Sequence, residues 1–130
     1  AASIANYRAS LGDPPLFIVW LDLLDHLRAT FGSDSKVSFD RRFEEIRKAP
    51  LLILDDLSTQ SMTPWVRDRL HQLFNHRYHA ELPTVITTAD STELMDARIR
   101  SRLLDARLCS MYHITVPSYH GPRQKRKTKK

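Results

Sequence analysis

The sequence predicts an α/β protein, a three-layer fold in which helices cover a parallel sheet. Short apolar runs alternate with longer segments of helical spacing along most of the 130 residues, an order that is typical of parallel sheets. Residues 51–54 are four consecutive aliphatic side chains, which indicates a strand buried on both faces. Asp55 and Asp56 follow at once. Because a buried charge is costly, the pair indicates that this strand ends at the rim of the sheet.

Three helices and one strand are expected before this run. Residues 1–11 carry apolar side chains three and four positions apart and stop at a Gly-Asp-Pro-Pro turn, as in the last part of a helix. Residues 16–20 predict a strand, and residues 21–31 return to helical spacing. Ser38 is the expected N-cap of the third helix, which ends before Pro50 because the residue preceding a proline disfavours the helical conformation.

Two helices and two strands are expected after the aspartates. Thr63 followed by proline is typical of a helix start, and the helix is expected to run to about residue 80. Residues 84–88 predict a strand, residues 96–106 an arginine-rich helix and residues 111–116 a final strand. The predicted order is therefore α, β, α, α, β, α, β, α, β.

The positive charge of the chain is concentrated at its C-terminus. The net charge is +5, but residues 121–130 hold six of the 20 Lys and Arg residues and no acid, which leaves 14 basic against 15 acidic residues elsewhere. We expect residues 1–120 to form one nearly neutral domain and residues 121–130 a disordered tail. The tail would bind DNA phosphates without sequence preference, or it is a solubilising extension. Its candidate DNA-binding residues are Arg123, Lys125, Arg126, Lys127, Lys129 and Lys130.

Cysteine content and apolar run length exclude several protein classes. Cys109 is the only cysteine, so an intramolecular disulfide and a cysteine-based zinc cluster are excluded. The apolar runs are much shorter than the roughly 18 to 20 residues of a membrane span, and no basic-then-apolar leader is present. We expect a cytoplasmic protein that does not act in a membrane.

The aspartate pair is the main candidate for chemistry. An apolar strand that ends in two carboxylates suits a nucleotide site, in which one acid holds a Mg²⁺ shell and the next polarises the attacking water. The alternative is two solvated acids at the start of a loop. The 84–88 run ends in the hydroxyls of Thr87 and Thr88, which could bind a water or phosphate near Asp55 and Asp56, or reflect ordinary β-propensity.

A second candidate is the arginine-rich helix. Arg98 and Arg102 are four positions apart and share one face, while Arg100 points elsewhere. These residues form a solvated basic face paired with Asp96 and Asp105, or one of them reaches a phosphate site in a neighbouring subunit. The second role suits arginine because its planar, always-charged fork stabilises transition-state charge.

Five stretches of the chain resemble one family in order and spacing. LLILDDLSTQSMTPWVRDRL is similar to the Walker B region of the DnaC/DnaI helicase loaders and the related IstB transposition ATPases, within the AAA+ group. AASIANYRASLG resembles the helix after the phosphate loop, and FIVWLDLLDHLRATF the next strand and helix. LPTVITTAD resembles the sensor 1 strand, and DARIRSRLLD the arginine-finger helix. The resemblance covers nearly everything except the tail.

The resemblance implies roles for individual residues. Asp55 corresponds to the Mg²⁺-associated Walker B acid, and Asp56 to the catalytic carboxylate. Arg102 matches the arginine finger, which acts on ATP in an adjacent subunit, and Arg98 is the alternative.

Two sensor positions depart from the family pattern. Thr88 lies near sensor 1, where the family's usual Asn is Ala89. The sensor 2 arginine falls on His120, with Arg123 as a displaced candidate. These departures leave recognition of the γ-phosphate open.

The largest departure concerns the phosphate loop. The GxxxxGK[ST] sequence is not found in these 130 residues, and it supplies the backbone N–H groups, the lysine and the Mg²⁺-binding hydroxyl. The family's first strand, which lies between the sensor 1 strand and the last strand, is not found either. We therefore expect an incomplete sheet of the P-loop NTPase type, in a fragment that lacks the loop and is inactive by itself.

The leading interpretation is an AAA+ helicase loader that acts in DNA replication with ATP and Mg²⁺. The resemblance implies the replicative DNA helicase or a transposase as partner, single-stranded DNA as ligand, and a homo-oligomer joined through the arginine finger. The alternatives are an IstB-like transposition helper, a non-catalytic adaptor that binds DNA or the helicase, and a Mg²⁺-dependent phosphatase or nuclease that uses Asp55 and Asp56.

Overall fold

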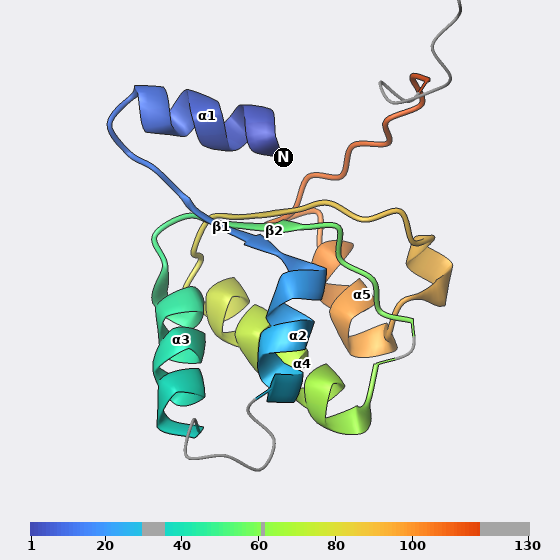
Figure 1. Ribbon diagram of the computed structural model, residues 1–130. Helices are drawn as coiled ribbons and strands as arrows, with labels where there is room; N and C mark the ends of the chain where they lie inside the picture. Colours follow the sequence, from blue (N-terminus) through green and yellow to red (C-terminus); the bar gives the residue numbers. More distant parts are fainter. Residues whose placement is uncertain (30–35, 61, 118–130) are drawn as a thin grey trace, which may run out of the picture.

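The computed structural model describes residues 1–29, 36–60 and 62–117, and its centre is a three-stranded parallel sheet (Figure 1). The strands are β1 (Leu16–Val19), β2 (Leu52–Asp55) and β3 (Thr84–Ile86), in the spatial order β1-β2-β3. Leu52 pairs with Leu16 on one side and with Thr84 on the other. The predicted α/β fold with a parallel sheet is confirmed.

The helices lie on both sides of the sheet in unequal number. Figure 1 shows α2, α3, α4 and α5 on one side of the strands and α1 on the other. None of the residues of α1 is buried. The helices are α1 (Ala2–Ser10), α2 (Trp20–Ala29), α3 (Lys36–Lys48), α4 (Pro64–His79) and α5 (Ala97–Leu103), with a short 3-10 turn η1 (Thr92–Leu94).

Strand β2 is the centre of the core. Leu52, Ile53 and Leu54 are all fully buried. Because side chains alternate along a strand, Leu52 and Leu54 share one face and Ile53 takes the other. Leu52 and Leu54 belong to a cluster with residues of the covering helices, including Ile46 of α3 and Leu70 of α4. The predicted burial of this strand on both faces is confirmed.

A buried arginine joins α3, α4 and β3. Arg77 on α4 is only 2% exposed, and its guanidinium donates to backbone oxygens at the end of α3 and before β3 and to a hydroxyl on β3. The acceptors are the oxygens of Ile46, Arg47 and Ala49 at 3.2, 3.2 and 2.7 Å, that of Pro83 at 2.7 Å, and Thr84 Oγ1 at 2.7 Å. Burial lowers the pKa of Arg77 to about 10. Arg77 thus donates to carbonyl groups at the C-terminal end of α3, where carbonyls lack intrahelical partners, and connects that end to β3.

Helix starts agree with the sequence in one case and differ in another. Thr63 caps α4, with its Oγ1 accepting from the N–H of Val66 at 3.3 Å, and Pro64 is the first helical residue. Helix α3 begins at Lys36, so the prediction that Ser38 is its N-cap is wrong. Position 38 lies inside the first turn, where serine is tolerated.

The C-terminal part of the chain differs from the prediction. Helix α5 ends at Leu103 rather than near residue 106, and residues 111–116 form no strand. Four apolar side chains of this segment are 56–85% exposed: Met111, Tyr112, Ile114 and Val116. A strand needs a hydrogen-bonded neighbour. In the described part of the chain, β3 is the last strand of the sheet and does not pair with this segment.

No helix in residues 1–29, 36–60 and 62–117 is long and apolar enough to cross a membrane. The expected disordered tail, residues 121–130, lies outside the described residues.

Candidate functional site

The carboxyl ends of β2 and β3 meet at one edge of the sheet. Asp55 is the last residue of β2, and its Oδ1 accepts a hydrogen bond from Thr87 Oγ1 at 2.6 Å. The same oxygen of Thr87 accepts from the backbone N–H of Asp56 at 2.9 Å. Thr87 thus fixes the orientation of the first carboxylate and the backbone of the second.

Asp56 turns the chain sharply at this edge. Its φ is 57°, in the left-handed region, which costs a residue with a side chain energy but is tolerated best by aspartate and asparagine. The residue is exposed, and within the described ranges its carboxylate makes no hydrogen bond or ion pair. The N–H of Leu57 donates to the oxygen of Thr87 at 2.8 Å, which fixes the backbone after the turn. The Asp56 carboxylate is therefore exposed to solvent, and hydrogen bonds from the N–H groups of Asp56 and Leu57 to Thr87 fix the backbone beneath it.

The loops after β2 and β3 are joined by a second set of bonds. Asp90 Oδ2 accepts from the N–H of Thr59 at 2.9 Å. Thr88 Oγ1 donates to the oxygen of Leu57 at 2.6 Å and accepts from the N–H of Asp90 at 3.0 Å. The hydroxyl of Thr88 is thus used inside the protein, and Thr87 is the threonine that contacts the aspartate pair.

Sequence reasoning named the hydroxyls of Thr87 and Thr88 but missed the contact of Asp90 with Thr59. Thr87 directly follows β3, Asp90 lies four residues beyond its end, and carboxyl ends of neighbouring parallel strands share an edge. That rule predicted both hydroxyls at this edge, and the structure shows that Thr87 contacts Asp55 whereas Thr88 donates to the oxygen of Leu57.

The edge offers ligands suited to Mg²⁺. Carboxylate and hydroxyl oxygens are the donors that this hard cation prefers, and it usually keeps several waters and few carboxylates. Asp55 and Asp56 fit that chemistry. Among residues 1–29, 36–60 and 62–117, no group of three His, Cys, Asp or Glu could hold a metal ion by itself.

Arg102 lies elsewhere, against α4. Its Nη2 donates to Asn75 Oδ1 at 3.0 Å, and its guanidinium carbon lies 4.5 Å from the centre of the Tyr78 ring. Arg102 also lines a cavity of about 230 Å³ with Pro83, which precedes β3, and with Thr84 and Ile86 on β3. Asp55 is the last residue of β2 and Asp56 follows it, and neither is among the residues that line this cavity. The structure therefore does not bring Arg102 to Asp55 and Asp56 of the same chain.

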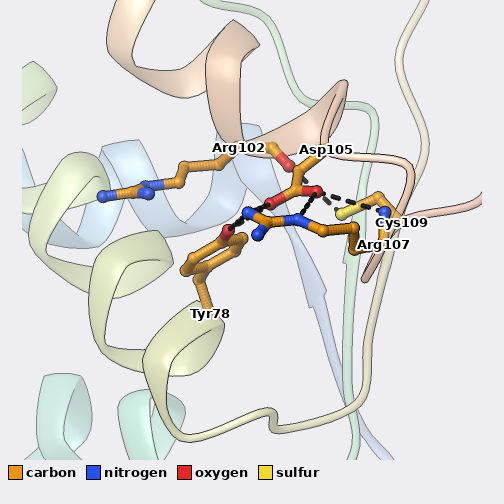
Figure 2. Close-up of polar contacts among 5 residues, drawn as sticks. All are labelled: Tyr78, Arg102, Asp105, Arg107 and Cys109. Atoms are coloured by element: carbon orange, nitrogen blue, oxygen red, sulfur yellow. Dashed lines mark hydrogen bonds and ion pairs between the residues drawn. The ribbon is translucent and has the colours of Figure 1, made fainter.

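Figure 2 shows a polar network beneath Arg102. The hydroxyl of Tyr78 donates to Asp105 Oδ2, and Arg107 donates to both carboxylate oxygens of Asp105 at 2.9 and 2.8 Å. These bonds, first that from Arg107 and then that from Tyr78, lower the pKa of Asp105 well below its usual range, and the carboxylate raises the pKa of Arg107. The thiol of Cys109 donates to the oxygen of Arg102 at 3.2 Å, and burial raises its pKa.

The other two arginines of α5 differ in exposure. Arg98 donates to Asp68 at 3.3 Å and lies 3.7 Å from Asp96, with about half of its side chain exposed. The predicted pairing with Asp96 is confirmed for Arg98. Arg100 is half-buried. The sensor 2 candidates His120 and Arg123, and the basic residues of the tail, lie outside the described residues.

Comparisons of the sequence and of the fold with known proteins point to the same group of proteins. No family model matches the chain. The chain is 24% identical over 105 residues to the replicative helicase loader DnaC of Escherichia coli K12, covering 81% of this chain and 42% of that protein. It is 33% identical over 52 residues to the replicative helicase loader DnaI of Bacillus subtilis 168, covering 39% of this chain and 17% of that protein.

The fold agrees with the sequence comparison. A solved structure of DnaI superposes with a TM-score of 0.67 and 25% identity, over 83% of this chain and 61% of that one. The chain is DnaC/DnaI-like. The AAA+ resemblance and the fold class that it implied are confirmed. This DnaC/DnaI-like chain spans about 42% of the length of the DnaC protein that it matches.

Proposed function

We propose that the chain belongs to an ATP-dependent loader of the replicative DNA helicase and carries its Walker B edge. The observation that carries the proposal is the arrangement at the ends of β2 and β3. Thr87 holds Asp55 and the N–H of Asp56, and the Asp56 carboxylate faces solvent. The same chain resembles two proteins named as replicative helicase loaders.

The two aspartates have different roles in this proposal. Asp55, already oriented by a hydroxyl, holds waters of a Mg²⁺ shell. Asp56 has a free carboxylate and orients the attacking water toward the terminal phosphate. Bound Mg²⁺ and ATP would supply charge neutralisation and the phosphoanhydride bond that is hydrolysed. The sensor roles suggested for Thr88 and His120 belong to the same proposal, and for Thr88 the internal use of its hydroxyl limits the role to positioning the loop.

Arg102 acts in trans in this proposal. It packs on α4 near the start of β3, and the carboxylates lie past the end of β2. A residue so placed can serve a phosphate only if a second copy brings one to it. The proposal therefore includes a homo-oligomer, with residues 1–120 as the AAA+ part and Arg98 as the alternative finger.

The basic residues at the end of the chain complete the proposal. Residues 123–130 would contact single-stranded DNA through its phosphates, because lysine and arginine release counterions on binding. The partner protein is the replicative DNA helicase, or a transposase if the chain acts as an IstB-like helper. ATP and Mg²⁺ are the proposed cofactors.

The test of the site is ATP hydrolysis by the protein translated from the whole reading frame that contains these 130 residues. Asp56→Asn is expected to lower kcat by about 100-fold or more while ATP binding persists, since the carboxylate acts on water and not on the nucleotide. Asp22→Asn, an exposed acid on α2, is the matched control and is expected to hydrolyse ATP normally. Equal loss in both variants, or none in Asp56→Asn, would overturn the proposal.

The second candidate is a non-catalytic adaptor that keeps the fold and binds DNA or the helicase. The observation in its favour is Ala89, which stands where the resembling family has a polar residue, with the neighbouring Thr88 hydroxyl bonded internally. An adaptor would neither bind nor hydrolyse ATP in the same assay. Sequencing the reading frame upstream of Ala1 gives an independent answer, because only the ATPase needs GxxxxGK[ST] there.

A further inference from the structure

Two side chains of α4 hold the guanidinium of Arg102. Asn75 and Tyr78 are three positions apart on the helix, so they present one continuous surface toward α5. Asn75 Oδ1 accepts from Nη2 at 3.0 Å, and the ring of Tyr78 lies under the guanidinium at 4.5 Å. A cation over an aromatic face is attracted by the ring's negative centre. Arg102 is thus held at one edge and on one face.

The ring of Tyr78 is itself fixed. Its hydroxyl donates to Asp105, whose side chain is only 13% exposed, and Arg107 donates to the same carboxylate and lies 3.5 Å from the hydroxyl. Figure 2 shows Tyr78 rising from α4 toward Asp105 and Arg107, which come from the segment after α5. A ring fixed at its far end keeps a constant orientation, so the guanidinium resting on it does too.

The remaining donors of Arg102 are available. Within residues 1–29, 36–60 and 62–117, its Nε and Nη1 groups donate to no other residue. Arginine carries five N–H donors in a rigid fork, so fixing one edge and one face sets the direction of the others. An anion that approaches from outside the chain meets pre-oriented donors.

We propose that Tyr78 and Asn75 are positioning residues that orient Arg102 toward a phosphate group held by a second copy of this chain. The inference rests on the proposed role of Arg102 as an arginine finger and adds the residues that make the finger effective. A flexible arginine would lose rotamer entropy on each encounter, whereas one held by Tyr78 and Asn75 has lost it already.

The test uses the whole reading-frame protein and compares ATP hydrolysis with variants at three positions. Arg102→Ala is expected to lower kcat by more than about 100-fold, as arginine fingers contribute ~10³–10⁵. Tyr78→Leu, which removes the ring, is expected to lower kcat roughly three- to tenfold with the KM for ATP unchanged. Tyr78→Phe keeps the ring and is expected to stay within about threefold of the original.

A double variant separates positioning from simple packing. With Arg102→Ala already present, adding Tyr78→Leu is expected to change kcat by less than about twofold, because the ring then has nothing to orient. Asn75→Ala is expected to show the same dependence on Arg102, and it serves where Tyr78→Leu lowers the folded fraction measured by circular dichroism.

The outcomes distinguish this inference from the function on which it rests. If Arg102→Ala keeps full kcat, the finger role fails and the positioning role fails with it. If Arg102→Ala loses activity but Tyr78→Leu and Asn75→Ala do not, the positioning inference alone is overturned. Effects of Tyr78→Leu that persist in the Arg102→Ala background would also overturn it, since they would reflect packing between α4 and α5.

Discussion

Arg77 shows how a single polar residue can stabilise a small α/β core. Four of its five hydrogen bonds go to backbone oxygens at the end of α3 and before β3 and the fifth goes to Thr84 Oγ1, and no carboxylate lies within ion-pair distance among the described residues. The guanidinium thus acts as a hydrogen-bond donor rather than as an ion-pair partner. Such a buried cation is stable only while all of these acceptors remain in place.

The first prediction concerns Arg77→Met. The variant keeps length and removes all five hydrogen bonds, leaving buried carbonyl groups without donors, so we expect a loss of about 3–5 kcal/mol in the free energy of unfolding. Urea unfolding measures it. Arg69→Met is the matched control, because Arg69 lies on the same helix over the half-buried Trp65 and its loss is expected to cost less than about 1 kcal/mol. Equal losses would show that Arg77 has no special role.

The second prediction uses pH and Asp105. The pKa of Asp105 is lowered in the folded protein by Arg107 and Tyr78, so its ionised form stabilises the fold above the unfolded-state pKa of about 3.9. That contribution is lost as the pH falls through the folded-state pKa. Asp105→Asn is therefore expected to lower Tm near pH 7, and the difference from the original protein is expected to shrink only as the pH falls below about 3.9 toward the folded-state pKa. A Tm difference independent of pH would contradict the assigned interaction.

The residue-scale site was partly predictable from the sequence. Asp55 and Asp56 stand out because they follow four consecutive aliphatic residues. Such a run predicts a buried strand from the sequence alone. Thr87 did not stand out over Thr88, because both hydroxyls follow the same strand. Arg77 lies on the buried face of α4 together with Leu70, Leu73 and Phe74, but a charged residue is not expected to be buried until its hydrogen-bond acceptors are known.

Some helices and strands could be predicted from local sequence, whereas others depended on tertiary contacts. Two adjacent residues, Thr63 and Pro64, predict the start of α4, and the structure confirms it. Whether residues 111–116 form a strand depends on a neighbouring strand to pair with, which the local sequence pattern does not reveal. The end of α5 also differs from the local prediction: the helix ends at Leu103, and Asp105 beyond it bonds Tyr78 and Arg107.

The third prediction tests the N-cap of α4. Thr63→Ala removes the hydroxyl that accepts from the N–H of Val66, and we expect a loss of about 1 kcal/mol in the free energy of unfolding. Ser91→Ala is the control, because Ser91 precedes η1 without a side-chain cap hydrogen bond. Its cost is expected to stay within about 0.5 kcal/mol. Thermal unfolding of the two variants side by side gives the comparison, and a larger cost for Ser91→Ala would refute the cap assignment.

In the whole molecule, the two groups proposed for phosphate chemistry lie apart. The Asp56 carboxylate is exposed at the carboxyl edge of the sheet, and Arg102 is held near the other end of the strands. Neither completes a phosphate-transfer site with the other in one chain. The fold class followed from the alternation of strands and helices, and the resemblance suggested that Arg102 acts in an adjacent subunit, whereas the contacts of Arg102 with Asn75 and Tyr78 were visible only in the structure.

The proposed role of this DnaC/DnaI-like chain in loading the replicative DNA helicase is tested by a binding titration. The labelled protein from the whole reading frame is titrated with the replicative DNA helicase of the same cell, and a variant without residues 121–130 separates helicase binding from non-specific DNA binding. We predict saturable binding with a Kd of about 1 µM or tighter in both forms. No saturable binding up to about 100 µM, or binding only to a transposase, would contradict the proposed helicase-loading role.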